Sequence, residues 1–258
     1  MRILFIGDII GRPGRRLVQK LLPGLRAELE LDFVVANAEN IAAGAGITGD
    51  CASEMFDVGV NVLTGGNHIW DKEEGIAVVD RDARIVRPVN YPPGTPGRGL
   101  GVYPVGEHRV AVVSVLGQIF MNPPLDCPFR AVDGALTRLA GQAGVVLVDV
   151  HAEATSEKIA LCWYLDGRVS AVLGTHTHVQ TADERILPRG TAALTDVGMT
   201  GPRDSIIGVR KELALRRMLS SMPVRFQTAD GDPELQAVPL EVDPGSGRAG
   251  RIERIRRT

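Results

Sequence analysis

MRILFIGDIIGRPG forms residues 1–14 of the chain, and it places a short apolar run, Ile3 to Ile6, directly before Gly7-Asp8. Such a run is typical of a buried strand, because a strand that is covered on both faces is apolar throughout. The same pattern recurs along the chain, and it predicts further buried strands at 33–36, 60–63, 110–115, 145–150 and 169–173.

Helical patterns with glycine or acidic boundaries lie between and after these strands. They predict helices at 15–31, 50–58, 131–140, 156–165 and 207–219. Because strand and helix alternate, the predicted fold class is α/β. The 258 residues show no clear linker and no internal repeat, so we expect a single domain over 1–258.

Two regions interrupt the alternation. Residues 87–101 are rich in Pro and Gly, and 117–129 is long, apolar and rich in Pro, so both are expected to be loops. The second loop has the composition of a segment that covers a site or packs against another subunit, so a homo-oligomer is one expectation. After Met222 the helical signal gives way to 224–228, 234–242 and a short run near 250–256, which predicts an antiparallel finish.

Composition excludes several classes of protein. The 29 basic and 31 acidic side chains give a net charge of −2, so no overall field attracts duplex nucleic acid or an anionic membrane. No stretch approaches the roughly 20 apolar residues of a membrane span, and the apolar start is too short for a signal peptide, so we expect a cytoplasmic protein. Cys51, Cys127 and Cys162 lack Cys-x-x-Cys spacing and are interpreted as reduced, buried thiols.

Two nucleotide-binding motifs are also absent. None of the four lysines ends a glycine-rich phosphate loop, which excludes a P-loop nucleotidase. Gly7, Gly11 and Gly14 follow the first strand, but their spacing differs from the dinucleotide-binding fingerprint, so we expect no Rossmann cofactor.

Side chains that can bind metals follow directly after the predicted strands. They form five clusters: Asp8, then Glu39-Asn40, then Asn67-His68, then His151, then His176 with His178. The carboxyl ends of strands in an open α/β sheet line one crevice, so the clusters are expected to meet in space. Four of the five histidines of the chain belong to them, and only His108 lies outside.

The number of donors predicts more than one metal ion. Two carboxylates, two amides and three imidazoles exceed the four ligands of a tetrahedral zinc site. Two ions fit the set better, because a carboxylate such as Glu39 can bridge metals roughly 3.5–4 Å apart, the arrangement used in phosphoryl displacement.

The ordered clusters resemble the calcineurin-like metallophosphoesterase superfamily, with its Asp, bridging acid, Gly-Asn-His, His and His-x-His blocks. The first blocks depart from it, because Asp8-Ile9-Ile10 replaces Asp-x-His and Glu39-Asn40 replaces the bridging Asp. That departure is characteristic of the YmdB-like bacterial phosphodiesterases, in which the Asn amide oxygen stands in for the absent His. The similarity to this group extends over GDIIGRPG (7–14), AEN (38–40), GNHIWD (66–71) and VHAEATSEK (150–158).

The resemblance implies a four-layer α-β-β-α sandwich with mixed sheets, and it implies roles for the clusters. One metal would be held by Asp8, Glu39, Asn40 and His178, and the other by Glu39, Asn67, His151 and His176. The implied reaction is hydrolysis of small phosphodiesters, above all 2′,3′-cyclic nucleotides and then 3′,5′-cyclic ones, by a metal-activated hydroxide. His68 would be the general acid that protonates the leaving oxygen, because it adjoins a proposed ligand.

Other functions stay open at this point. A phosphomonoesterase or protein phosphatase shares the same metal site and differs in pocket shape. A regulatory or RNA-associated module with incidental activity is disfavoured, because a scaffold does not need a full ligand set together with His68. We expect iron or manganese at this site. Zinc fits as well, because ligand type alone does not separate the three metals.

Weaker signals have ordinary explanations. Arg12 could contact a phosphate, but a solvated loop arginine is the favoured interpretation. Asp149, Glu153 and Asp196 either orient ligand imidazoles or have surface and capping roles. Residues 248–258 carry five arginines and one acid, which suits a solvated terminal strand better than an RNA contact.

Overall fold

The computed structural model describes residues 1–258, and the first strand of the chain lies at the centre of one of its two sheets. On one side of β1 (Arg2–Ile6) run three parallel strands, β3 (Phe33–Asn37), β4 (Val62–Thr64) and β5 (Ile85–Val86). On its other side β13 (Pro233–Val242) runs antiparallel and is followed by β12 (Met199–Pro202) and β2 (Asp8–Ile9). The short strands β14 (Ala249–Ile252) and β15 (Ile255–Arg257) also pair with β13.

The second sheet has six strands around a parallel centre. Its order is β10 (Arg185–Ile186), β11 (Ala192–Leu194), β9 (Ala171–Thr175), β8 (Val145–His151), β7 (His108–Leu116) and β6 (Leu100–Val105). Strands β7, β8, β9 and β11 are parallel, and the edge strands β6 and β10 are antiparallel to their neighbours. Both sheets are therefore mixed.

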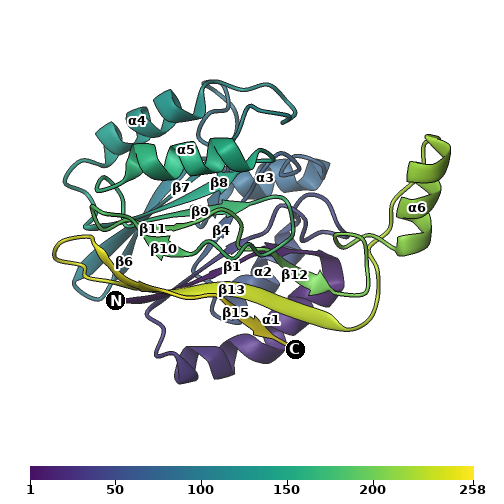
Figure 1. Cartoon of the computed structure of the whole chain (residues 1–258), viewed down its shortest axis with the longest axis horizontal. Helices are drawn as coiled ribbons and strands as arrows, with labels where there is room; N and C mark the ends of the chain where they lie inside the picture. The colour runs from purple at the N-terminus through teal and green to yellow at the C-terminus, as the bar shows by residue number, and fades with distance from the viewer.

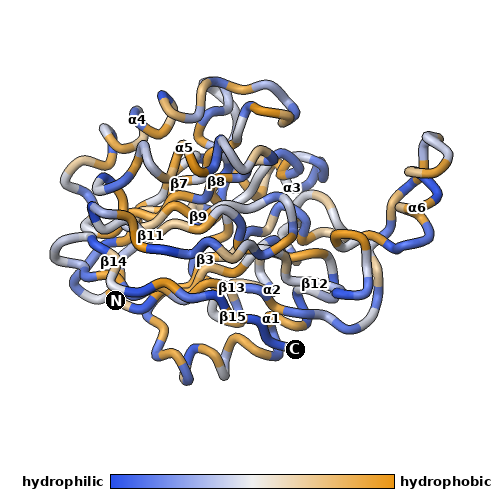
Figure 2. The backbone as a smooth tube through the Cα atoms, in the orientation of Figure 1, coloured by the Kyte–Doolittle hydropathy of each residue, from blue (hydrophilic) through white to orange (hydrophobic).

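Helices cover the outer face of each sheet, which gives four layers (Figure 1). Helices α1 (Gly11–Glu28), α2 (Gly49–Asp57) and α3 (Glu73–Arg81) lie on the first sheet, and α4 (Pro128–Leu139) and α5 (Thr155–Leu165) on the second. Separate apolar clusters fill the three spaces between layers, and the central strands carry most of the apolar colour (Figure 2). The predicted α-β-β-α sandwich is confirmed, whereas the single domain stays a prediction.

Helix α6 (Lys211–Ser220) projects from the body on an arm (Figure 1). Only Ala214 is buried within it, so the helix has almost no support from the rest of the chain. It begins four residues later than predicted, because Ile206 and Val209 pair in a tight turn in which Gly208 has a φ of 96°. No helix combines the length and the apolar character of a membrane-spanning segment.

Three sequence predictions are wrong in detail. Residues 224–228 do not form a strand of the antiparallel finish, since only Thr228 pairs, in an isolated bridge with Val209. The loop predicted at 87–101 is too long, because β6 begins at Leu100. This strand contains Pro104, which an edge strand tolerates. Helix α3 was not predicted, because its polar Glu73–Arg81 sequence buries only Gly75 and Val79.

Candidate metal centre

The five clusters predicted from the sequence meet at one place, and they come from both sheets. Asp8 lies in β2, and Glu39 and Asn40 follow β3, so these belong to the first sheet. His151 ends β8, and the turn His176-Thr177-His178 follows β9 in the second sheet. The donor atoms of Glu39, His151 and His176 all lie within 4.8 Å of one another.

Each of the three imidazoles has one nitrogen held by a protein acceptor. Nδ1 of His151 lies 2.8 Å from Oγ1 of Thr175, and Nδ1 of His178 lies 2.9 Å from the carbonyl oxygen of Ile207. Nε2 of His176 lies 3.2 Å from a carboxylate oxygen of Glu153. Such bonds fix the orientation of a ligand imidazole and raise its basicity. The remaining nitrogen of each ring faces another donor of the cluster: that of His151 lies against Glu39, that of His176 against the His151 ring, and that of His178 against Asp8.

Glu39 lies between two groups of donors. Its Oε2 is 3.1 Å from Nε2 of His151, which in turn contacts Nδ1 of His176 at 3.1 Å and Oδ1 of Asn67 at 3.2 Å. Its Oε1 accepts a hydrogen bond of 3.0 Å from Nδ2 of Asn40. One carboxylate oxygen therefore faces each group, which is the geometry that a bridging ligand needs.

The second group contains a buried oxygen with no partner. Oδ2 of Asp8 accepts a hydrogen bond from the backbone nitrogen of His176, but Oδ1 is buried and accepts none. Nε2 of His178 lies 3.8 Å from that oxygen and 3.3 Å from Nδ2 of Asn40. A half-turn of the Asn40 amide exchanges its nitrogen for an oxygen donor. A buried carboxylate oxygen without a partner is costly, so this donor set fits a cation.

The charge states of the cluster suit metal ligands. Burial raises the pKa of Asp8 to about 6. Burial also acts to raise the pKa of Glu39, but attraction to the His151 ring outweighs it and lowers the pKa to about 2. Burial and then repulsion from His151 lower the pKa of His176 to about 3. At pH 7 Glu39 is therefore a carboxylate and His176 is neutral, the forms that bind metals.

His151 is protonated in these surroundings. Burial opposes its charge, but the carboxylates around it, led by Glu39, outweigh burial and raise its pKa to about 9. A bound cation would replace this proton, because both need the same ring nitrogen.

Position 66 has room only for glycine. A Cβ on Gly66 would overlap Oε2 of Glu39 and the His151 ring.

His68 lies beside the cluster and faces the cavity. Its backbone nitrogen donates to Oε2 of Glu39 at 3.2 Å, and Nδ1 of its ring lies 2.8 Å from Oδ2 of Asp71. This contact leaves Nε2 as the nitrogen that can hold a proton toward a ligand. Asp71 was not predicted as an orienting residue, although it belongs to the GNHIWD sequence at 66–71.

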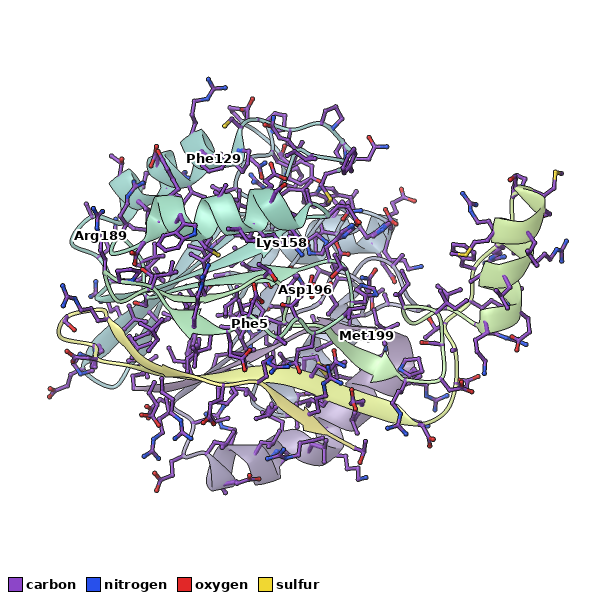
Figure 3. The ribbon with its side chains drawn as sticks, viewed as in Figure 1. Phe5, Phe129, Lys158, Arg189, Asp196 and Met199 are labelled. Atoms are coloured by element: carbon purple, nitrogen blue, oxygen red, sulfur yellow. The ribbon has the colours of Figure 1, made fainter.

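A buried ion pair supports the His176-Thr177-His178 turn (Figure 3). Nζ of Lys158, on α5, contacts Oδ2 of Asp196 at 2.7 Å, and both side chains are fully buried. The same oxygen accepts hydrogen bonds from the backbone nitrogen and hydroxyl of Thr177, at 3.1 and 2.8 Å. Asp196 thus has the orienting role that was one of its two interpretations. Lys158 was missed, because a lone lysine in a helix gives no sign of burial.

A second buried network supports His151. Asp149 accepts hydrogen bonds from Thr175 Oγ1 at 2.7 Å and Asn37 Nδ2 at 3.0 Å, and burial raises its pKa. Because Thr175 also contacts Nδ1 of His151, the network fixes the position of that ring. The three proposed orienting residues, Asp149, Glu153 and Asp196, therefore all contact the cluster or its turn.

A cavity of about 470 Å³ opens beside the cluster. The polar part of its lining includes Glu39, Asn40, His68, Glu153, His176 and His178. The apolar part of the lining, here called the apolar wall, includes Ile10, Ile207, Val209 and Phe226. Its volume is in the range of small-molecule sites.

Other predicted features lie outside the site. Arg12 is exposed as expected, but it lies in the first turn of α1 and not in a loop. All three cysteines are free thiols; Cys51 and Cys162 are buried, whereas the predicted burial of Cys127 is wrong, because it lies at the start of α4 and is partly exposed. Most of the terminal arginines have protein partners, as Arg254 pairs with Glu184 and Arg257 with Glu28. This agrees with a solvated terminal strand.

Comparison with known proteins places the chain in a family. A family model described as YmdB-like protein matches residues 4–255. A 2′,3′-cyclic-nucleotide 2′-phosphodiesterase of Bacillus subtilis is 46% identical over 255 residues, 99% of this chain and 96% of the relative.

Two solved structures are similar over nearly the whole chain. A hypothetical protein from Thermus thermophilus is 47% identical with a TM-score of 0.94, covering 99% of this chain and 98% of that one. A novel phosphatase from Mycoplasma pneumoniae is 34% identical with a TM-score of 0.94, covering 99% and 92%. The resemblance found in the sequence motifs is confirmed, and the chain belongs to the YmdB-like protein family, whose fold is that of the metallophosphoesterases.

Proposed function

We propose that the protein is a metal-dependent phosphodiesterase that hydrolyses small phosphodiesters, above all 2′,3′-cyclic nucleotides. The observation that carries this proposal is the set of three imidazoles that are each held at one nitrogen and turn the other toward the carboxylate-containing donor cluster. The activity named for the Bacillus subtilis relative supports the substrate class.

The donors suit two metal ions with Glu39 between them. Asp8, Glu39, Asn40 and His178 would hold one ion, and Glu39, Asn67, His151 and His176 the other. Bound there, the ions would supply Lewis-acid activation of water and neutralise charge on the phosphate. The unpartnered Oδ1 of Asp8 and the two-sided Glu39 carboxylate support this assignment.

His68 is assigned the proton transfer to the leaving oxygen. Its ring is anchored through Nδ1 to Asp71, so Nε2 is presented to the cavity in a defined direction. When the P–O bond to the leaving oxygen breaks, that oxygen takes the proton from Nε2. A general acid in such a position contributes roughly 10²–10⁴-fold to the rate.

The apolar wall of the cavity faces the donor cluster and suits a nucleoside. Phe226 is 47% exposed and lines this wall, so its ring is available to a base. Stacking on an aromatic ring tolerates any base. We therefore expect hydrolysis of several 2′,3′-cyclic nucleotides, with 3′,5′-cyclic nucleotides as further substrates.

The test is hydrolysis of 2′,3′-cyclic AMP by protein loaded with manganese or iron. Chelator-treated protein, Asp8→Ala and His68→Ala should lose activity, whereas the control His108→Ala should keep it, since His108 is exposed and outside the site. Product formation in the presence of excess chelator, or full activity of Asp8→Ala, would contradict the proposal.

The same assay also distinguishes a phosphodiesterase from a phosphomonoesterase, which has the same kind of metal site. Faster hydrolysis of 2′- or 3′-AMP than of the cyclic diester would favour that alternative. Measuring bound metals selects among iron, manganese and zinc. Cytoplasmic location and homo-oligomerisation stay predictions.

A further inference from the structure

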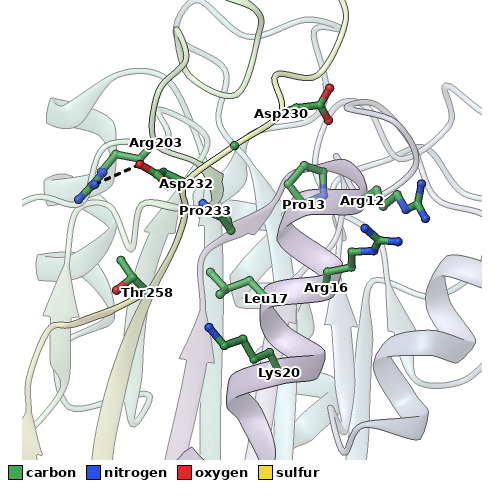
Figure 4. Close-up of a pocket in the computed structure, with 11 residues that line it drawn as sticks. Arg12, Pro13, Arg16, Leu17, Lys20, Arg203, Asp230, Asp232, Pro233 and Thr258 are labelled. Atoms are coloured by element: carbon green, nitrogen blue, oxygen red, sulfur yellow. Dashed lines mark ion pairs between the residues drawn. The ribbon is translucent and has the colours of Figure 1, made fainter.

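A second cavity, larger than the one beside the donor cluster, is lined by other residues. It has a volume of about 650 Å³ and lies between α1 and the residues that lead into β13 (Figure 4). Four cationic side chains line it: Arg12, Arg16, Lys20 and Arg203. The only carboxylate side chains in its lining are those of Asp230 and Asp232, so cations outnumber them.

Three of these cations have no protein partner. Arg12, Arg16 and Lys20 make no hydrogen bond or ion pair, whereas the neighbouring Arg15 contacts Glu54 at 2.7 Å. Some other surface arginines of the chain are paired, such as Arg168 with Asp133. This cavity differs from the rest of the surface because three unpaired cations of one helix line a single space, where the contact of 3.9 Å between Arg203 and Asp232 is weak.

The spacing of the three cations suits a chain of charges better than a single one. They follow one another at every fourth residue of α1, so their backbone positions share one face of the helix, from which Arg12 and Arg16 extend to one side and Lys20 to the other (Figure 4). At 1.5 Å rise per residue, neighbouring positions are about 6 Å apart along the axis. This is close to the repeat of an extended phosphodiester backbone, in which each nucleotide carries one negative charge.

The cationic cavity adjoins the cavity of the donor cluster. Ile10 and Thr228 line the site, while Arg12 and Asp230, two residues further along each strand of chain, line the cationic cavity. Gly11, which lies between Ile10 and Arg12, packs closely on Thr228, because a Cβ on Gly11 would lie 3.1 Å from the Thr228 hydroxyl. The two cavities are therefore lined by neighbouring residues of the same two segments.

We propose that the cationic cavity binds the phosphodiester backbone of a short RNA whose 3′-terminal 2′,3′-cyclic phosphate lies at the metal site. This inference rests on the proposed function, because a 2′,3′-cyclic phosphate requires the ribose 2′-oxygen. The terminal nucleotide occupies the site, and the phosphates on its 5′ side lie against Arg12, Arg16 and Lys20. The natural substrates are then RNA fragments that a 2′-hydroxyl-dependent cleavage has left with cyclic ends.

The test compares kcat/KM for 2′,3′-cyclic AMP with kcat/KM for a tri-ribonucleotide that ends in a 2′,3′-cyclic phosphate. We expect the wild type to prefer the trinucleotide. The double variant Arg16→Ala/Lys20→Ala should reduce that preference about 10-fold, because it removes two contacts to phosphates. Each lost contact should also lower the slope of log affinity against log salt concentration by about one unit. Arg109→Ala, which removes an exposed arginine on β7, is the matched control and should leave the preference unchanged.

Direct binding separates failure of this inference from failure of the proposed function. A labelled tri-ribonucleotide with a 3′-phosphate, measured at about 50 and about 200 mM salt, should bind the wild type more tightly than the double variant. Equal binding by the two proteins would overturn the inference even if the cyclic mononucleotide is hydrolysed. Displacement by an equal concentration of inorganic phosphate would show a site for single phosphates and would also overturn it. Lack of turnover with both cyclic substrates contradicts the proposed function instead.

Discussion

The buried pair of Lys158 and Asp196 allows a quantitative test of how the metal centre is held. Removing one charge leaves the other buried, which typically destabilises a protein by about 3–5 kcal/mol. Lys158→Met is the milder change, because Asp196 keeps hydrogen bonds from Thr177 and from the backbone nitrogen of Gly198 at 2.8 Å. We expect it to lower the free energy of unfolding by about 2–3 kcal/mol, and Asp196→Asn by about 3–5 kcal/mol.

The double variant Lys158→Met/Asp196→Asn removes both charges and should recover part of the loss. Coupling between residues in direct contact reaches about 0.5–3 kcal/mol, so the double variant should be more stable than the sum of the single changes by about 2–3 kcal/mol. Urea unfolding of all four proteins measures this coupling. Lys211→Met is the matched control, because its partner Asp204 is exposed, and its midpoint should equal that of the wild type.

The same variants test whether the pair acts through the proposed metal ligands His176 and His178. His176 and His178 have φ values of 103° and 63°, in the region that favours glycine, and the bonds of Asp196 to Thr177 hold the turn between them. Such strain costs about 1–3 kcal/mol per residue, so a turn released from Asp196 should relax. In variants shown to be folded, metal affinity should fall about 10–100-fold. Strictly additive stabilities, or unchanged metal affinity in the folded variants, would refute this account.

Three further outcomes follow from other contacts of the site and core. Asp71→Asn should lower kcat about 10–100-fold with little change in bound metal, because Asp71 orients His68 without contacting the donor cluster. A loss of bound metal larger than the loss of kcat would contradict that role. Gly66→Ala should abolish metal binding while circular dichroism stays close to wild type, since the added Cβ overlaps Glu39 and His151. Burial raises the pKa of the Cys162 thiol to about 12, so at pH 8 iodoacetamide should label the partly exposed Cys127 and reach Cys162 only after unfolding, as mass spectrometry would show.

The central strands and the five clusters were predictable because their signals are local. An apolar run such as Ile3 to Ile6 specifies a buried strand, and the donor that follows it must lie at the carboxyl end of that strand. The expectation of a single crevice was incomplete, because Asp8 and Glu39 come from the first sheet whereas His151 comes from the second. Nothing local in the sequence specifies how two sheets face each other.

The supporting residues were harder to predict because their roles depend on distant partners. Lys158 and Asp196 are separated by 38 residues, and each is ordinary in its own segment. Element ends also shifted, as β9 (Ala171–Thr175) continues two residues past its apolar run to reach His176. Such ends depend on pairing with the neighbouring strand rather than on composition.

The first block of the motif shows how a lost ligand can be replaced without extra charge. Where the wider superfamily usually has histidine, this chain has Ile10, which is buried and lines the apolar wall of the cavity. The amide of Asn40 lies instead against both Glu39 and His178, at 3.0 and 3.3 Å. An amide oxygen is a neutral donor that does not titrate, so the donor count is kept while the wall gains an apolar side chain. In our proposal this exchange moves one ligand from the end of β2 to the segment after β3 and gives its former place to the substrate.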